Sequence, residues 1–299
     1  MSGLYIHIPF CASRCIYCGF YSTTLLPLQD AYVEALCKEM KMQKPVDPVQ
    51  TVYLGGGTPS LLSRGNLEKL FANIHAIYGR KTEESTVHHP ESFREVTIEC
   101  NPDDITDEFA REIVSLGINR VSIGAQTFSP ARLRFIHRRH TAEQIPAAVH
   151  RLRNAGIHNI SIDLMFGFPG ETLQDYQKTL DLMEKVRFDT LFSFQYSERQ
   201  GTAAVGLDGK VSAEEKRRRL IELQALQDRH TQEKNSALVG RTVEVLVEGT
   251  SRNTPRDVSG RTRSNKIVNF AGGRDLAGKT VRVRVVEAFL HSLRGEMQD

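Results

Sequence analysis

Short β-branched runs alternate with amphipathic stretches along the first 200 residues of the chain. The β-branched runs predict six strands, at residues 3–7, 51–55, 95–99, 120–124, 158–164 and 190–196. The amphipathic stretches predict helices at residues 30–41, 65–78, 107–116, 142–155 and 172–185. This alternation is typical of βα units, and six units predict a partial, open barrel of the α/β class. A polar stretch at residues 80–93 is interpreted as a surface insertion before the third strand.

The pattern changes after residue 211. Ser212 followed by Glu215 predicts a capping box at the start of a long charged helix. Beyond it the period becomes two in VGRTVEVLVEG, NKIVNFAG and KTVRVRVVEAF, which predict the strands of a small antiparallel barrel. We therefore expect a core at residues 1–211, a linking helix at 212–236 and a small all-β domain at 237–299.

The composition indicates a cellular compartment and an uneven distribution of charge along the chain. There is no leader segment with a basic start and no apolar run of membrane-spanning length, so we expect a cytoplasmic protein without membrane insertion. Residues 237–299 hold 11 Lys and Arg against 7 Asp and Glu, whereas the preceding 236 residues hold 28 against 29. The basic surplus of the C-terminal part is a modest indication of nucleic-acid binding.

Three of the five cysteines form a CxxxCxxC run directly after the first predicted strand. They are Cys11, Cys15 and Cys18. Thiolates at this spacing can hold three irons of a 4Fe-4S cubane and leave the fourth iron open to a ligand. The alternative is a zinc site with His7 as the fourth ligand. Cys37 and Cys100 stand alone and are interpreted as small buried residues.

Glycines and carboxylates follow other predicted strands, at the edge where parallel α/β folds gather their sites. Gly56, Gly57 and Thr58 can bring the backbone close to a ligand and offer its N–H groups, although a tight turn uses the same residues. Glu99 and Asp163 end apolar strands, where an unpartnered carboxylate is costly to bury. A ligand-binding role is therefore favoured for both carboxylates.

Polar residues near the fourth predicted strand give weaker signals. Gln126 resembles the two carboxylates in its position at a strand end. Arg138 lies in the segment HRRH, where a solvated basic face is the favoured interpretation from the residues alone. His137 and His140 flank the arginine pair and are interpreted as solvated helix-end histidines rather than metal ligands.

Taken together, the motifs LYIHIPFCxxxCxYCxF, LGGGTPS, IECNPDD, SIGAQTF and DLMFGFPGET resemble the radical S-adenosylmethionine (SAM) superfamily. Within it, residues 1–165 resemble the oxygen-independent coproporphyrinogen III oxidase family and its heme-chaperone relatives. This resemblance implies a partial (βα)6 barrel, one 4Fe-4S cluster on the cysteine run, and SAM chelated at the open iron. It also implies reductive cleavage of SAM to methionine and a 5′-deoxyadenosyl radical, with an electron donor such as flavodoxin or ferredoxin.

The same resemblance implies a set of SAM-binding residues. They are Tyr5, Tyr17, Gly56, Gly57, Thr58, Glu99, Gln126, Arg138 and Asp163. Among these, Tyr17 holds the aromatic position between the last two cysteines, and Asp163 is expected at the ribose hydroxyls.

From about residue 167 onward the chain is similar to a second family, the tRNA methylthiotransferases. The last block resembles a TRAM domain, a small RNA-binding, OB-like β-barrel, which implies tRNA as a partner. Five basic residues are candidates for phosphate contacts that position RNA without reading its sequence. They are Arg252, Arg261, Arg263, Lys266 and Arg294, each of which has a solvated basic surface as its alternative.

The two resemblances meet within residues 160–175, and a chimeric gene explains the combination most simply. The methylthiotransferases carry an N-terminal domain with three more cysteines for a second, sulfur-supplying cluster, whereas the oxidase family ends in a domain concerned with porphyrin or heme. We therefore predict a radical SAM enzyme that acts on tRNA without sulfur insertion. The alternatives are a heme-synthesis or heme-chaperone role, with porphyrinogen or heme as partner, and a non-catalytic protein that binds cluster and RNA.

Overall fold

The structure is a computed structural model, and it describes residues 2–43, 48–79, 93–252 and 254–298. The chain divides into two compact units, Met1–Glu222 and Leu223–Asp299. The boundary falls inside the long helix α7 (Ala213–Ser236). Apart from Phe93, the predicted insertion at residues 80–93 lies outside the described residues.

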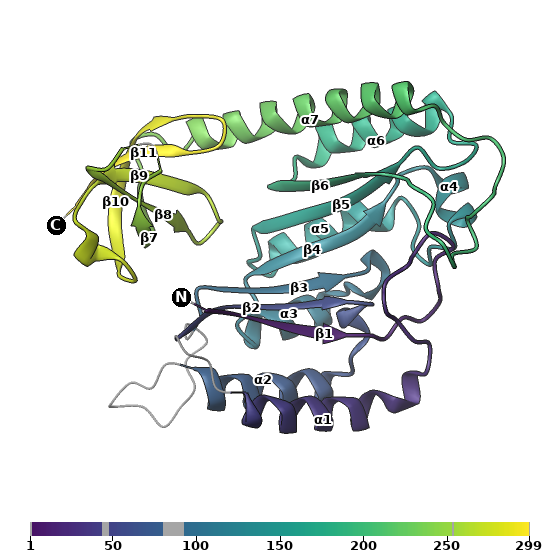
Figure 1. Cartoon of the computed structure of the whole chain (residues 1–299), viewed down its shortest axis with the longest axis horizontal. Coiled ribbons are helices and arrows are strands. Elements are labelled where there is room, and N and C mark those ends of the chain that lie inside the picture. Colours follow the sequence, from purple (N-terminus) through teal and green to yellow (C-terminus); the bar gives the residue numbers. More distant parts are fainter. Residues whose placement is uncertain (1, 44–47, 80–92, 253, 299) are drawn as a thin grey trace. The chain divides into compact units, whose positions relative to one another are not determined.

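A six-stranded parallel sheet forms the centre of the first unit (Figure 1). Its strands are β1 (Ser2–Ile8), β2 (Val49–Gly56), β3 (Glu95–Cys100), β4 (Arg120–Gln126), β5 (Asn159–Phe166) and β6 (Thr190–Gln195). Spatial order equals chain order, so β1 and β6 are the two edges of an open sheet. The partial α/β barrel predicted from the sequence is confirmed.

Helices follow the strands in turn, and α1 and α2 lie side by side along one flank of the sheet (Figure 1). The helices are α1 (Gln29–Met42), α2 (Arg64–Tyr78), α3 (Asp107–Ser115), α4 (Pro130–Phe135), α5 (Gln144–Asn154) and α6 (Leu173–Val186). The short α4 is not among the predicted helices. Its signal in the sequence is Ser129 at the N-cap, followed by Pro130 at the first helical position.

The two faces of the sheet differ in chemistry because successive strand residues point to opposite sides. Ile6, Leu54, Ile98, Ile123 and Ile162 occupy one face and are at most 4% exposed, so they form the core of this unit. The other face carries polar and aromatic side chains, which are described below. Hydrophobic burial on one face thus leaves the opposite face available for a ligand.

α7 begins with part of the predicted capping box. The Ser212 hydroxyl accepts the backbone N–H of Glu215 at 3.1 Å. The Glu215 carboxylate, however, pairs with Arg218 and Arg219, each at 2.8 Å. Within the described residues, no helix combines the length and apolar composition needed to cross a bilayer.

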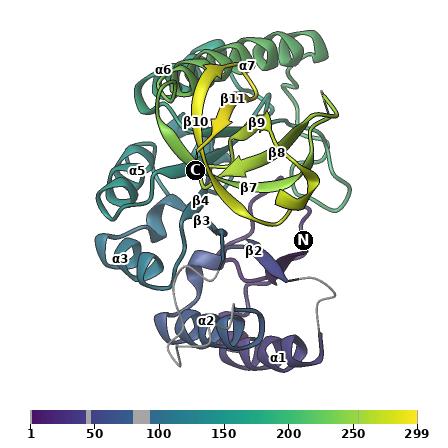
Figure 2. The same ribbon diagram turned by 90° about the vertical axis from the view of Figure 1, so that its left-hand side faces the viewer.

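A closed five-stranded barrel makes up most of the second unit (Figure 2). Its strands are β7 (Thr242–Thr250), β8 (Asp257–Thr262), β9 (Ile267–Ala271), β10 (Thr280–Ala288) and β11 (Leu293–Met297). The predicted small all-β barrel is confirmed, but it is not antiparallel throughout, because β9 and β11 pair in parallel. The hydrophobic pattern revealed neither β8 nor β11. These two strands carry Gly260 and Gly295, where a Cβ would lie 2.2 Å from Leu246 O and 2.3 Å from a Val283 methyl carbon. Glycine at such close approaches interrupts the apolar alternation that marks a strand.

Candidate functional site

The cysteine run forms a loop directly after β1, at the carboxyl end of the parallel sheet. Two backbone hydrogen bonds shape it, from Cys11 N to Thr23 O at 2.9 Å and from Cys18 N to Cys15 O at 3.2 Å. All three thiols are free and partly exposed. The loop therefore presents three separate sulfurs, as a cubane requires when each thiolate binds a different iron.

A zinc site, the alternative for these cysteines, is not supported by the geometry. Both ring nitrogens of His7 already have partners, since Nδ1 lies 3.1 Å from Tyr5 Oη and Nε2 lies 3.1 Å from Tyr21 O. Within the described parts of the chain, no three His, Cys, Asp or Glu side chains converge closely enough to hold a single metal ion. Tetrahedral zinc needs such convergence, whereas a cubane does not.

The glycine-rich loop after β2 packs tightly against the cysteine loop. Gly57 N donates to Ile8 O at 2.8 Å, and Thr58 N donates to Phe10 O at 2.7 Å. Gly56 N donates to Glu99 Oε2 at 3.0 Å. The expectation that this loop offers its N–H groups to a ligand is thus wrong for all three residues. Backbone pairing with the end of β1 and the chain just after it occupies the N–H groups of Gly57 and Thr58. The Glu99 carboxylate occupies that of Gly56.

Glycine is required in this loop for contact with protein rather than with a ligand. A Cβ at Gly57 would lie 2.7 Å from Phe10 O, and Gly56 has a φ of +118° with His7 in contact range. The Thr58 hydroxyl lies 3.6 Å from Cys11 Sγ and can donate a hydrogen bond to this sulfur. The predicted loop residues are therefore placed beside the cysteine triad.

Glu99 lies on the polar face of the sheet, with both carboxylate oxygens engaged. Tyr53 Oη donates to Oε1 at 2.7 Å, and Gly56 N donates to Oε2 at 3.0 Å. The Tyr5 ring, 58% exposed, stacks on Tyr53 with a centroid distance of 6.0 Å. Burial first, and then the charge of Glu99, raises the pKa of Tyr53, so the phenol remains a donor to Glu99.

Asp163 lies on the same face, in β5. Ser122 Oγ donates to Asp163 Oδ1 at 3.2 Å, and the strand register places Phe192 of β6 next to it. Burial, followed by the negative charge of Glu99, raises the pKa of Asp163 to about 7. The second predicted carboxylate therefore titrates near neutrality and can change its charge when a ligand binds.

Arg138 belongs to the site, and its interpretation as a solvated basic residue is wrong. Its Nη2 atom donates to Asn101 Oδ1 and to Gly124 O, and its Nη1 atom lies 3.7 Å from Cys15 Sγ. A Schellman turn ends α4, with His137 in the left-handed region at a φ of +59° and Arg138 N bonded to Leu133 O at 2.9 Å. This turn reverses the chain and directs Arg138 inward.

His140 is also placed differently from the prediction. It is only 2% exposed, with Nδ1 3.1 Å from Asn101 Oδ1 and Nε2 3.2 Å from Ala125 O. Burial and the nearby Arg138 lower the pKa of His140 to about 3, so the imidazole is neutral. His137, by contrast, is exposed as predicted. Asn101 was missed, although it follows Glu99 closely at a strand end.

Tyr17 and Gln126 complete the predicted cofactor set. The Tyr17 ring packs on Phe168 at a centroid distance of 5.4 Å and is hydrogen-bonded to the Cys15 side chain. Burial, the largest influence, raises the pKa of Tyr17, so the phenol stays protonated. Gln126 ends β4 in the left-handed region with a φ of +66°. Such a conformation is uncommon for a residue with a side chain and is frequent at functional sites.

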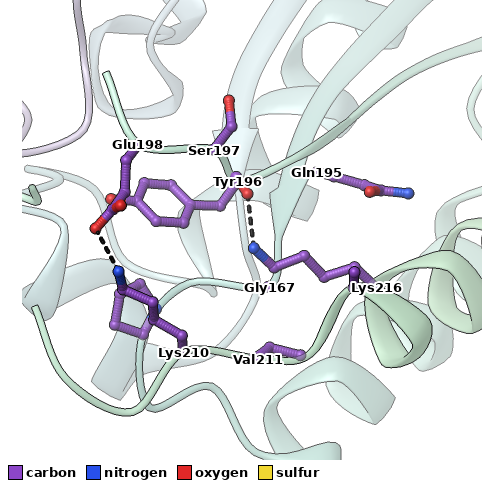
Figure 3. Close-up of a pocket in the computed structure, with 10 residues that line it drawn as sticks. Gly167, Gln195, Tyr196, Ser197, Glu198, Lys210, Val211 and Lys216 are labelled. Carbon is purple, nitrogen blue, oxygen red and sulfur yellow. Dashed lines mark hydrogen bonds and ion pairs between the residues drawn. The ribbon is translucent and has the colours of Figure 1, made fainter. Parts of the chain in front are cut away.

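Figure 3 shows a hollow at the carboxyl ends of β5 and β6. Gly167, Tyr196, Glu198, Lys210 and Lys216 are among the residues that line it. Lys210 Nζ pairs with Glu198 at 3.0 Å, and Lys216 Nζ donates to Tyr196 O at 2.7 Å. Its charged side chains are therefore already partnered within the protein.

Most of the predicted RNA-binding residues of the barrel already pair with other side chains of the second unit. Four of the five have partners inside the second unit: Arg261 with Glu248 at 3.2 Å, Arg263 with Glu244 at 3.1 Å, Lys266 with Asn235 at 2.6 Å, and Arg294 with Asp257. Arg252 is exposed. Arg282 and Arg284 of β10 are exposed as well, and they were missed. The alternation in TVRVRVV, which places both arginines on the outer face, is the signal that could have found them.

Family models match both units. Residues 5–183 match the model of the radical SAM superfamily, and residues 236–297 match that of the TRAM domain. The chain belongs to the radical SAM superfamily. The combination of a radical SAM domain with a C-terminal TRAM domain, predicted from the motifs, is thereby confirmed. The 4Fe-4S cluster and SAM predicted as cofactors are those that this superfamily uses.

Curated relatives of this radical SAM protein include synthases that act on tRNA. The tRNA-2-methylthio-N(6)-dimethylallyladenosine synthase of Syntrophus aciditrophicus (strain SB) is 40% identical over 269 residues, covering 88% of this chain and 56% of that protein. The enzyme of the same name from Moorella thermoacetica is 37% identical over 273 residues, covering 89% and 59%. The chain thus spans somewhat more than half the length of these relatives. The match also reaches beyond residues 167–299, where the motifs first indicated this family.

Among solved structures, coproporphyrinogen III oxidase from Escherichia coli superposes with a TM-score of 0.67. It is 22% identical in sequence, and the match covers 87% of this chain and 66% of that one. At this level of identity the likeness shows a shared fold.

The residues present fit the cofactors of the superfamily. Cys11 and Cys15 each have a hydrogen-bond donor within 3.7 Å of the sulfur, from Thr58 and Arg138. Hydrogen bonds to ligand sulfurs are a general feature of protein-bound iron–sulfur clusters. Asp163, a carboxyl with a pKa of about 7, and the partly exposed aromatic rings on the same face suit a cationic nucleoside such as SAM.

Proposed function

We propose that this chain is a radical SAM enzyme that acts on an adenosine of tRNA. The observation that carries the proposal is the identity of about 40% to tRNA-2-methylthio-N(6)-dimethylallyladenosine synthases over 88% of the chain. We assign residues 1–211 to the radical SAM core, 212–236 to a linking helix and 237–299 to RNA binding. The structural likeness to coproporphyrinogen III oxidase, at 22% identity, shows the fold and carries no substrate.

When bound, the cluster and SAM together supply one-electron cleavage of the sulfonium, which yields methionine and a 5′-deoxyadenosyl radical. The residues of the chain bind and orient the reactants. Glu99, held at both oxygens, offers remaining lone pairs to the amino group of SAM. Asp163 accepts hydrogen bonds from the ribose hydroxyls when ionised. The exposed rings of Tyr5 and Phe192 lie on the same face, where they would pack against a bound ligand.

One cluster per chain is part of this proposal. The cysteines outside the triad, Cys37 on α1 and Cys100 on β3, are buried at 6% and 4% exposure. Burial raises the pKa of both thiols, which disfavours the thiolate form that binds iron. Reconstituted protein should therefore contain about four irons per chain, and about eight would contradict the proposal.

Exposed arginines of the barrel supply phosphate contacts in this account. Arg252, Arg282 and Arg284 are exposed, whereas Arg263 pairs with Glu244. In filter-binding assays across a salt series, the affinity for tRNA should fall as salt rises. The double substitution Arg282→Gln and Arg284→Gln should reduce the slope of log affinity against log salt by about 0.7 to 0.9 per lost contact.

Arg263→Gln is the matched control for this experiment, because its guanidinium is already neutralised by Glu244 at 3.1 Å. It should leave the slope closer to that of the unmodified chain. Heme binding together with an absence of tRNA binding would overturn the proposed function.

A further inference from the structure

The three cysteine sulfurs have unequal surroundings. Cys11 Sγ faces the neutral hydroxyl of Thr58 at 3.6 Å. Cys15 Sγ faces the guanidinium of Arg138 at 3.7 Å and also the phenol of Tyr17. In the described residues, Arg138 is the cationic side chain with a hydrogen bond to a cysteine sulfur. Cys15 therefore has a charged hydrogen-bond donor, whereas Cys11 has a neutral one.

The position of Arg138 is fixed by acceptors from two neighbouring strands. Its Nη2 atom donates to Asn101 Oδ1, just after β3, and to Gly124 O in β4. These two bonds leave Nη1 aimed at Cys15. Because a guanidinium is planar, fixing one nitrogen restricts the direction of the other.

Asn101 is itself held from several sides. Its backbone N–H donates to Ser60 Oγ at 3.1 Å, and its Nδ2 atom donates to Asp103. The buried, neutral His140 lies 3.1 Å from the same Oδ1 atom that receives Arg138. Because Asn101 is supported in this way, its Oδ1 atom should stay in place when the charge of the nearby cluster changes.

We propose that Arg138 raises the reduction potential of the cluster by donating a charge-assisted hydrogen bond to the Cys15 thiolate, with Asn101 as its positioning residue. This inference rests on the proposed function, in that it requires a cluster on the triad. Reduction adds one electron to the cluster. A fixed positive charge and an N–H···S bond stabilise the more negative, reduced form. The SAM-binding role assigned to Arg138 by resemblance is a separate property.

The test is a potentiometric titration of the reconstituted full chain, followed by the EPR signal of the reduced cluster, without SAM and without RNA. Arg138→Gln should shift the midpoint potential to more negative values. Arg138→Lys, which keeps the charge but loses the planar geometry, should produce a smaller shift in the same direction. Asn101→Ala keeps the guanidinium of Arg138 but removes one of the acceptors that fix its position. This variant should also lower the midpoint potential.

Arg139→Gln is the matched control. Its guanidinium pairs with Asp104 at 2.8 Å and with Asp103 at 3.4 Å. It should shift the potential far less than Arg138→Gln does, because its bonds go to the two carboxylates and not to a cluster thiolate. Equal potentials in the unmodified chain and in every iron-loaded variant at positions 138 and 101 would overturn the inference. If Arg138→Gln does not retain iron, Arg138→Lys and Asn101→Ala decide the outcome.

This readout separates the inference from the proposed function. The potential is measured without SAM cleavage and without tRNA, so failure to act on tRNA leaves the result intact. Conversely, a chain that binds no cluster, or binds one equally well after Cys15→Ala, would contradict the proposed site and the inference together.

Discussion

The hydroxyl group of Tyr53 on β2 donates a hydrogen bond of 2.7 Å to Glu99 on β3. The second carboxylate oxygen of Glu99 receives Gly56 N at 3.0 Å, so neighbouring parts of the sheet fix this side chain from both ends. A carboxylate held in this way is preorganised for a ligand, because little side-chain entropy remains to be lost on binding.

Removing the Tyr53 hydroxyl should weaken SAM binding. Tyr53→Phe is expected to raise the dissociation constant about threefold to tenfold, as the loss of one hydrogen bond predicts. Equilibrium dialysis with cluster-loaded protein measures this change. Tyr78→Phe, which loses a hydroxyl bonded to Met40 O at 3.1 Å in α1, is the matched control and should bind SAM normally. Equal affinities for both variants would argue against a role for Glu99.

The raised pKa of Asp163 predicts a pH dependence of SAM binding. Burial raises this pKa to about 7 in the free protein, and hydrogen bonds from a ribose to the carboxylate would lower it in the complex. Binding therefore releases a proton, and affinity should increase as pH rises toward 7 and level off above it. The steepest expected change is about tenfold per pH unit.

Asp163→Asn removes the titrating group while keeping the size of the side chain. Isothermal titration calorimetry between pH 5.5 and 8.5 should show weaker binding and no rise with pH for this variant. The idea fails if the variant keeps the pH dependence of the unmodified chain.

Gly57→Ala should disturb the cysteine loop. The added Cβ would lie 2.7 Å from Phe10 O and 2.8 Å from Pro9 C, which are backbone atoms and cannot turn away. We expect a loss of about 1–3 kcal/mol in the free energy of unfolding and reduced iron loading. Gly65→Ala is the control, since no atom lies within 4 Å of its Cβ in α2. That change should stabilise the protein slightly or leave it unaffected.

Glu171→Gln tests the buried ion pair of the first unit. Glu171 Oε2 lies 2.7 Å from Arg219 Nη1, and the two side chains are 1% and 3% exposed. This change leaves the buried Arg219 with Glu215, at 2.8 Å, as its remaining anion, and the unpaired Nη1 donor should cost about 1–3 kcal/mol, measured by urea unfolding. Glu68→Gln, which breaks an exposed pair with Arg64, should cost far less. Similar midpoints for the two variants would contradict this assignment.

Local sequence patterns were sufficient to predict the parts of the site that lie on strands. Short β-branched runs located β1 to β6, and the alternation of side chains along β3 and β5 puts Glu99 and Asp163 on one face. The spacing of the cysteines identified the triad, because a thiolate set is contiguous in the chain. These features depend on residues close in sequence and on the regular geometry of a parallel sheet.

The remaining features depend on contacts that no local pattern contains. Arg138 and Cys15 are 123 residues apart, and a left-handed turn at His137 brings them together. The ion pair between Arg263 and Glu244 likewise arises from the folding of the barrel. Sequence reasoning took both arginines for solvated or RNA-facing residues, because charge alone does not show where the partner lies.

The formation of 5′-deoxyadenosine by the reconstituted, anaerobically reduced chain tests the central claim most directly. We predict that product forms in the unmodified chain, increases when tRNA carrying N6-dimethylallyladenosine is added, and disappears after Cys15→Ala. Coproporphyrinogen III should cause no increase. Product formation that is stimulated by coproporphyrinogen III and not by tRNA, or that survives loss of Cys15, would contradict the account.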